Sequence, residues 1–132
     1  MRSRNVMFTL VLLLGIFLFA LYKKWQEPSP VEAFHRMPER LRFYAFARCR
    51  MECLAISEAD IQTIMQKGII NLNKSNRMAR PCPLFALQAR VQGQYLRVLF
   101  EQCRNGTYVV NCYNLEQETS CNCSADYQPK KH

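Results

Sequence analysis

The chain has 132 residues, of which 21% are charged, and its formal net charge is +8. This length leaves room for one small domain beside any membrane segment. The basic excess is mild and lacks the dense stripe of Lys and Arg typical of nucleic-acid binding, so we expect no nucleic-acid partner. Half of the excess flanks the first apolar run, as Arg2, Arg4, Lys23 and Lys24.

That apolar run, residues 6–22, predicts a membrane anchor. It contains no charged residue, and as a helix it would be about 25 Å long, which is enough for a short span. Tyr22 and Trp25 at its end are residues that favour the membrane surface. The alternative, a cleaved signal peptide, requires small residues at a cleavage site, whereas the run continues directly into Tyr-Lys-Lys-Trp. We therefore predict an uncleaved anchor over residues 1–25.

The rest of the chain divides into a linker, a domain and a tail. Residues 26–38 contain three prolines and are predicted to be a stiff linker. Residues 39–123 form the predicted domain, and the polar residues 124–132 are predicted to be a loose tail. Within the domain, residues 39–54 contain no Gly or Pro and predict a first helix.

A second helix is predicted over residues 58–67. Ser57 and Asp60 have the spacing of a capping box, in which two side chains satisfy free N–H groups at the start of a helix. Gly68 follows the helix, and we expect it to end the helix in the left-handed conformation that glycine adopts easily. An apolar stripe gives the helix a face for the core: Ile61, Ile64 and Met65.

The sequence pattern then changes to that of strands. Apolar and polar residues alternate in four segments, which predict strands at 69–73, 84–91, 95–102 and 107–115. Asn105-Gly106 predicts a tight hairpin turn, because both residues tolerate positive φ. The predicted fold class is therefore α+β: an N-terminal transmembrane helix, then two helices packed on a three- or four-stranded antiparallel sheet.

All seven cysteines follow the apolar run, which predicts that the domain lies in an oxidising compartment. The charges flanking the anchor are nearly balanced, so the cysteines decide the orientation: a single-pass protein with the C-terminal domain outside, in the periplasm. The disulfide candidates are Cys49, Cys53, Cys82, Cys103, Cys121 and Cys123, while Cys112 inside a predicted strand is left over. Connectivity does not follow from spacing.

Two other uses of the cysteines stay open. Cys49, Cys53, Cys121 and Cys123 have the number of thiols that holds zinc tetrahedrally, although paired CxxC motifs are absent. They also fit a redox module. Disulfides agree better with the predicted topology, so we expect no metal.

Catalytic residues are scarce. The chain has two histidines, His35 in the predicted linker and His132 at the end, and neither position suits a buried general base. No Gly-rich phosphate loop occurs. We therefore expect no cofactor, name no catalytic residue, and lean towards a protein that is not an enzyme.

Basic residues are the remaining candidates for a site. The simplest interpretation of these basic residues is that they belong to a solvated surface without a ligand. The sharper hypothesis is that an anionic ligand or a protein partner is bound by Arg48, Arg50, Arg90 and Arg97.

Several stretches resemble a bacterial family of membrane-anchored proteins. They are ARCRMEC at 47–53, ISEADI at 56–61, KGIINLNKS at 67–75, CPLFAL at 82–87, GQYLRVLFEQC at 93–103 and VVNCYNL at 109–115, followed by Cys-Asn-Cys at 121–123. Over residues 47–123 the chain resembles the family called domain of unknown function 4258, in a membrane-anchored branch found in Bacteroidetes.

The resemblance implies an α+β domain whose outline is similar to RelE-like or BrnT-like toxins; as fold analogy it implies no activity. The family typically has His where Phe46 stands and Arg-His where Leu54 and Ala55 stand, so a histidine site of relatives would be missing here. Three hypotheses follow: a non-enzymatic envelope module that binds a protein or an anion, a RelE-like enzyme acting on RNA or its degenerate relative, and a cysteine-based redox or metal module.

Overall fold

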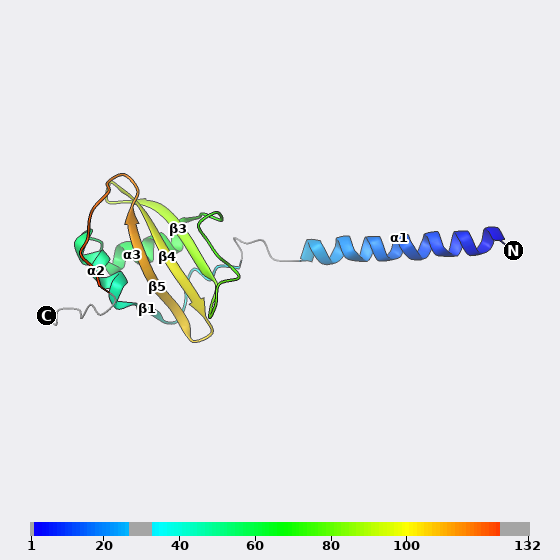
Figure 1. Ribbon diagram of the computed structural model, residues 1–132, viewed down its shortest axis with the longest axis horizontal. Helices are drawn as coiled ribbons and strands as arrows, with labels where there is room; N and C mark the ends of the chain where they lie inside the picture. The colour runs from blue at the N-terminus through cyan, green and yellow to red at the C-terminus, as the bar shows by residue number, and fades with distance from the viewer. Residues whose placement is uncertain (1, 27–32, 125–132) are drawn as a thin grey trace. The chain divides into compact units, whose positions relative to one another are not determined.

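The computed structural model describes residues 2–26 and 33–124, in two compact units, Met1–Ala33 and Phe34–His132 (Figure 1). The first unit contains helix α1, Arg2–Gln26. By length and composition, α1 is the one helix of the described residues that is able to cross a membrane. The predicted N-terminal apolar helix is thus confirmed. Residues 27–32 of the predicted linker and 125–132 of the predicted tail lie outside the described residues.

The second unit is an α+β domain, as predicted, with two helices and a five-stranded sheet. Along the chain, its elements are β1 (Leu41–Phe43), α2 (Ala45–Cys53), α3 (Glu58–Lys67), β2 (Ile69–Ile70), β3 (Leu84–Val91), β4 (Gln94–Cys103) and β5 (Gly106–Asn114). The strand order is β1-β5-β4-β3-β2. Of the four pairs of neighbouring strands, three are antiparallel, and the fourth, β1 with β5, is parallel. The prediction of a purely antiparallel sheet of three or four strands was therefore wrong in this detail.

Strand β1 replaces the beginning of the helix predicted over residues 39–54. Leu41 and Phe43 pack against the core while Arg42 between them is exposed, which is the alternation of a strand. β1 pairs with Thr107–Val109 of β5, and the helix begins only at Ala45. Pairing with a distant strand outweighs the helix propensity of this segment.

Helix α3 has the predicted bounds, and the Ser57–Asp60 capping box is present. Gly68 ends the helix as predicted, but the reason predicted for the glycine was wrong. Gly68 has φ −64°, so it is not left-handed. A Cβ atom at this position would instead lie 2.3 Å from the Ile64 carbonyl oxygen and 3.3 Å from that of Gln88. Glycine is required because two backbone segments meet there.

We expect Gly68→Ala to destabilise the domain by about 1–3 kcal/mol, since the added methyl group meets backbone that cannot move aside. Gly68→Asn should be at least as damaging. If left-handed geometry were the reason for the glycine, Asn would be tolerated better than Ala. Urea unfolding of both variants decides between the two explanations. Gly93 is the comparison for left-handed geometry, because its φ is +78° and nothing lies within 4 Å of a Cβ there, so Asn should be tolerated better than Ala at that position.

The two hairpins use different turns. Between β3 and β4, Gln92 and Gly93 both have positive φ, 49° and 78°, as in a type I′ turn. Between β4 and β5, Cys103 pairs with Gly106, so the turn residues are Arg104 and Asn105. Gly106 has φ +144°, and Asn105 does not have positive φ. The hairpin is therefore as predicted, while its turn lies one residue earlier.

The core lies between the sheet and the two helices. On β4, Leu96, Val98 and Phe100 are buried and alternate with residues of the opposite face. Figure 1 shows α2 and α3 together behind the sheet, with β3, β4 and β5 in front. α3 packs on β3 and α2 on β5. No helix of the described domain, residues 34–124, covers the front face.

The domain begins earlier than residue 39. Phe34 is 4% exposed, and its ring lies 5.2 Å from that of Phe85 and 5.7 Å from that of Phe100. Arg36 donates hydrogen bonds to three carbonyl oxygens at the end of α3. The segment predicted as a linker over residues 26–38 therefore contributes a core side chain and a helix contact.

Candidate functional site

The uncovered side of the sheet, called here the open face, carries a row of polar and aromatic side chains. On β4 the residues that alternate with the buried ones are Tyr95, Arg97, Leu99 and Glu101. Their neighbours in register on β3 and β5 belong to the same face: Leu84, Ala86, Gln88, Arg90, Tyr108, Asn111 and Tyr113. This is the face turned towards the viewer in Figure 1.

Tyrosine and arginine alternate across this face in three cation–π pairs. In each, the guanidinium carbon lies within 6 Å of the ring centroid, the range in which the ring attracts a cation. The pairs are Arg42 with Tyr108 at 5.7 Å, Arg50 with Tyr113 at 5.6 Å, and Arg90 with Tyr95 at 5.9 Å. Each pair keeps a flat ring and a charge in a fixed arrangement at the surface.

Tyr44 extends the row beyond β5. Its ring stacks on Tyr108 at 5.3 Å, with 19° between the planes. Its hydroxyl donates a 2.7 Å hydrogen bond to the Glu101 carboxylate. This hydrogen bond is the main cause that raises the pKa of Tyr44 to about 12, so the hydroxyl remains a donor at any ordinary pH.

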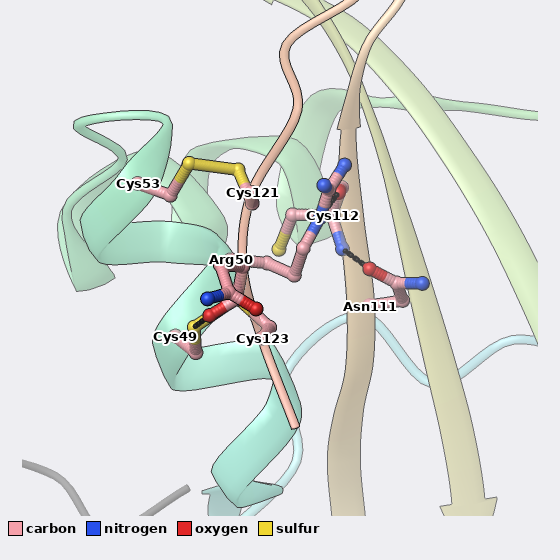
Figure 2. Close-up of a disulfide and its surroundings, with 8 residues drawn as sticks. Cys49, Arg50, Cys53, Asn111, Cys112, Cys121 and Cys123 are labelled. Atoms are coloured by element: carbon pink, nitrogen blue, oxygen red, sulfur yellow. Dashed lines mark hydrogen bonds between the residues drawn. A yellow bond between two sulfur atoms is a disulfide. The ribbon is translucent and has the colours of Figure 1, made fainter. Parts of the chain in front are cut away.

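Of the four predicted arginines, Arg50 contacts the Tyr113 ring and Arg97 lies on the neighbouring strand. Arg50 comes from α2, and its Nε donates a 3.1 Å hydrogen bond to the Cys112 carbonyl oxygen (Figure 2). Arg97 on β4 is the register partner of Tyr113 on β5. The Asn111 side chain completes the group, since it donates to the Tyr113 hydroxyl at 2.8 Å. The Tyr113 ring therefore contacts Arg50, while Arg97 is its neighbour in register. The Arg97 guanidinium lies 2.9 and 3.2 Å from the Gln88 side-chain amide on β3.

The other two predicted arginines are held in ion pairs. Arg48 contacts Glu58 at 2.7 Å, and its guanidinium carbon lies 4.4 Å from the Phe43 ring centroid, away from Tyr113. Arg90 pairs with Glu116, which raises the pKa of Arg90 and lowers the pKa of Glu116. Exposed pairs of this kind contribute little to stability. The four arginines thus do not form one cluster.

Three disulfides join the six cysteines that the sequence analysis names as candidates. They are Cys49–Cys123, Cys53–Cys121 and Cys82–Cys103. The first two fasten the segment after β5 to α2, as Figure 2 shows. All four thiols proposed for zinc or redox chemistry are therefore bonded in pairs.

Among the described residues, one group of side chains is close enough to hold a metal ion, and it consists of Cys82, Glu101 and Cys103. Two of its three members are bonded to each other. A disulfide sulfur is not the thiolate that zinc requires. In its oxidised form this group therefore offers one strong ligand, Glu101.

Cys112 is the remaining cysteine. It is free and fully buried, and burial raises the pKa of its thiol to about 12. The reactive thiolate is therefore absent at neutral pH. Figure 2 shows its side chain pointing towards α2 from β5.

We expect the folded chain to leave Cys112 unlabelled by iodoacetamide at pH 8, because its thiol is both protonated and inaccessible. After unfolding without reductant, one thiol per chain should react. Mass spectrometry counts the adducts. Labelling of several cysteines in the unfolded, non-reduced chain would contradict the three disulfides.

A cleft of about 440 Å³ lies at the β4–β5 turn, separate from the tyrosines. It includes His35, which the sequence analysis placed in the linker. The backbone N–H of His35 donates to the Gln102 side chain at 2.9 Å, and that side chain donates to the His35 carbonyl oxygen at 2.7 Å. Its other lining residues include two cations and one acid, Arg40, Arg104 and Glu39. The mixed charges favour no particular ligand.

Comparison with family models, with curated proteins and with solved structures finds no match to this chain. The fold and site therefore define the protein only by class: a disulfide-linked α+β domain preceded by an apolar helix. The sequence analysis missed the tyrosines of the open face. Their alternation with arginine and other polar residues along 95–101 and 108–113 was the available signal.

Proposed function

We propose that this protein is a non-enzymatic, single-pass membrane protein whose domain faces the periplasm or cell exterior and binds an acidic segment of another protein. The observation that carries the proposal is the Tyr113 ring in contact with Arg50, with Arg97 as its neighbour in register on the uncovered side of the sheet. Tyr and Arg are the residues most enriched where protein interfaces have their binding energy.

A protein partner fits this surface better than a small anion. Small ligands are usually bound in concave pockets, whereas the open face is the surface of a sheet. Its cationic groups are arginines, and the acid lying among them, Glu101, accepts a hydrogen bond from Tyr44. An acidic and aromatic segment would stack on the rings and pair with the guanidinium groups.

The outward orientation rests on the three disulfides, since such bonds persist in oxidising compartments. The thiol count described above separates this proposal from its rivals. One reactive thiol supports it. Seven reactive thiols would favour a cytosolic enzyme of RelE-like type acting on RNA, and a stoichiometric metal would favour the cysteine-based module.

We also propose that the chain is a divergent member of the family called domain of unknown function 4258. The stretches CRMEC at 49–53 and KGIINLNKS at 67–75 support this membership. They lie in α2 and around the junction of α3 with β2.

Photo-crosslinking in the native membrane tests the binding site. With a photoreactive amino acid in place of Leu99, on the open face, we expect a covalent adduct to one protein. The double variant Arg50→Ala with Arg97→Ala should lose the adduct at least about tenfold, because two charged contacts are removed. Arg48→Ala is the matched control, since it removes an arginine of the same helix that contacts Phe43 and Glu58 instead of Tyr113.

The Arg50 change also removes a hydrogen bond to the backbone, so a fold defect has to be excluded. Arg97→Gln alone keeps that bond and should reduce the adduct as well. Equal adduct yields from wild type, the double variant and Arg48→Ala would show that the arginines are solvated surface only.

A further inference from the structure

A second surface of the domain combines exposed apolar side chains with cations, and it differs from the open face in composition. It is formed by residues 67–80, here called the basic loop. No acidic residue occurs between Asp60 and Glu101. Within this acid-free stretch, the loop contains four exposed cations: Lys67, Lys74, Arg77 and Arg80.

The apolar side chains of the loop are unusually exposed. Ile69 is 75% exposed, Leu72 50% and Met78 83%. In the described part of the domain, residues 34–124, the other exposed large hydrophobic side chains are Met37, at 73%, and Tyr44, at 43%. Exposed apolar groups among cations are the composition of surfaces that insert into the headgroup region of anionic membranes.

The backbone of the loop is held in place by hydrogen bonds. The Ser75 hydroxyl donates to the Asn71 carbonyl oxygen at 2.7 Å and accepts from the Ala86 N–H at 2.9 Å. The Asn76 backbone exchanges two bonds of 2.8 Å with Leu84. The Asn76 side chain accepts from the Met78 N–H at 3.1 Å. The exposed side chains are therefore presented by an ordered segment, which lowers the entropy that binding would cost.

The loop also begins where the chain enters the domain from α1. Arg36 donates to the carbonyl oxygens of Met65 and Gly68, at 3.1 and 3.0 Å. Between Gln26 at the end of α1 and Ala33 there are six residues, which span at most about 25 Å. A membrane that holds α1 would therefore be within reach of this end of the domain, and a tethered surface needs only weak intrinsic affinity to stay bound.

From these observations we propose that the basic loop docks on the anionic phospholipid surface of the membrane in which α1 is anchored. Ile69, Leu72 and Met78 would enter the headgroup region. The four cations would pair with lipid phosphates. Such docking gives the domain a second attachment and limits its orientation above the membrane.

The test uses the full chain reconstituted in vesicles with a tryptophan as depth reporter. The chain has one Trp, so Trp25→Phe supplies a background into which Met78→Trp is introduced. Vesicles contain phosphatidylcholine with or without phosphatidylglycerol, and brominated lipids quench a tryptophan that touches the acyl chains. Ala59→Trp, at the exposed first turn of α3, is the matched control.

We expect brominated lipids to quench the reporter at position 78 at least about twofold more than the control at 59 in phosphatidylglycerol vesicles. Lys74→Glu with Arg77→Glu should remove this difference, as should 1 M salt, at which charges are screened beyond about 3 Å. Circular dichroism confirms that the variants remain folded.

Equal quenching at positions 78 and 59 in phosphatidylglycerol vesicles would overturn the proposal. Equal quenching at position 78 in vesicles with and without phosphatidylglycerol would also overturn it, because the cations would then have no role. Neither result depends on the partner proposed for the open face.

Discussion

Removing both disulfides that fasten the C-terminal segment to α2 is expected to destabilise the domain by more than the sum of the two separate removals. Cys49–Cys123 and Cys53–Cys121 close loops with sequence separations of 74 and 68. The second loop lies directly inside the first. Once either disulfide is formed, the other therefore closes a ring of only about eight residues, formed by 49–53 and 121–123. Each bond is thus a partial substitute for the other.

The loss of stability from each removal follows from the chain entropy of the loop that the disulfide closes. Removing one pair, as Cys53→Ala with Cys121→Ala, should cost about 2.5 kcal/mol, the value for the small ring. Removing both pairs should cost about 7 kcal/mol, since the long loop is then opened too. That loss is comparable with the whole stability of a typical domain.

Urea unfolding of the full chain in detergent micelles measures these changes. The pair Cys82–Cys103, with a sequence separation of 21, provides the comparison because it connects a different part of the domain. The loss of stability on removing Cys82–Cys103 together with Cys53–Cys121 should equal the sum of the two separate losses. If the two neighbouring disulfides also add within about 0.5 kcal/mol, they act independently and the nested-loop explanation fails.

The second large effect is expected at Phe34. Phe34→Ala should destabilise the domain by about 3–5 kcal/mol, because it opens a cavity between the rings of Phe85 and Phe100. Met37→Ala, three residues later and 73% exposed, should change stability by no more than about 0.5 kcal/mol. The same urea titrations compare the two variants.

This comparison also locates the start of the domain. A chain that begins at Glu39 loses both the Phe34 ring and the Arg36 contacts to the end of α3. Equal stability of Phe34→Ala and Met37→Ala would show instead that the domain begins near residue 39, as the prolines suggested.

Elements with local signals were predictable from the sequence. Helix α3 has its capping box, its apolar stripe and its final glycine within twelve residues, and its bounds were found. Strand β4 alternates between buried and less buried residues, and β3 and β4 both lie within a residue of their predicted ends. In these segments the physical cause of the structure and the residues that form it are neighbours in the chain.

Features that depend on distant residues were not predictable. Strand β1 exists because Leu41–Phe43 pairs with residues 107–109, and no pattern within 39–54 indicates this partner. Gly68 is required because the Ile64 and Gln88 backbones pass close by, which only the folded chain reveals.

In the candidate site, too, single residues could be named from the sequence, but their contacts could not. Arginines could be selected by their charge, so Arg50 and Arg97 were named, but Tyr113 beside them was not. Their meeting requires that α2 lie beside β5 and that β4 and β5 be in register. Arg48 was named for its charge as well, yet its helical position turns it to Glu58.

The two edges of the sheet are poorly suited to pair with a strand from another molecule. β1 covers β5 only at residues 107–109, and beyond it the Cys112 backbone is already occupied: its carbonyl oxygen accepts from Arg50 and its N–H donates to the Asn111 side chain at 2.8 Å. At the other margin, β2 has two residues. Both margins are thus poor templates for adding a strand from another molecule, which protects a crowded, tethered protein from edge-to-edge aggregation.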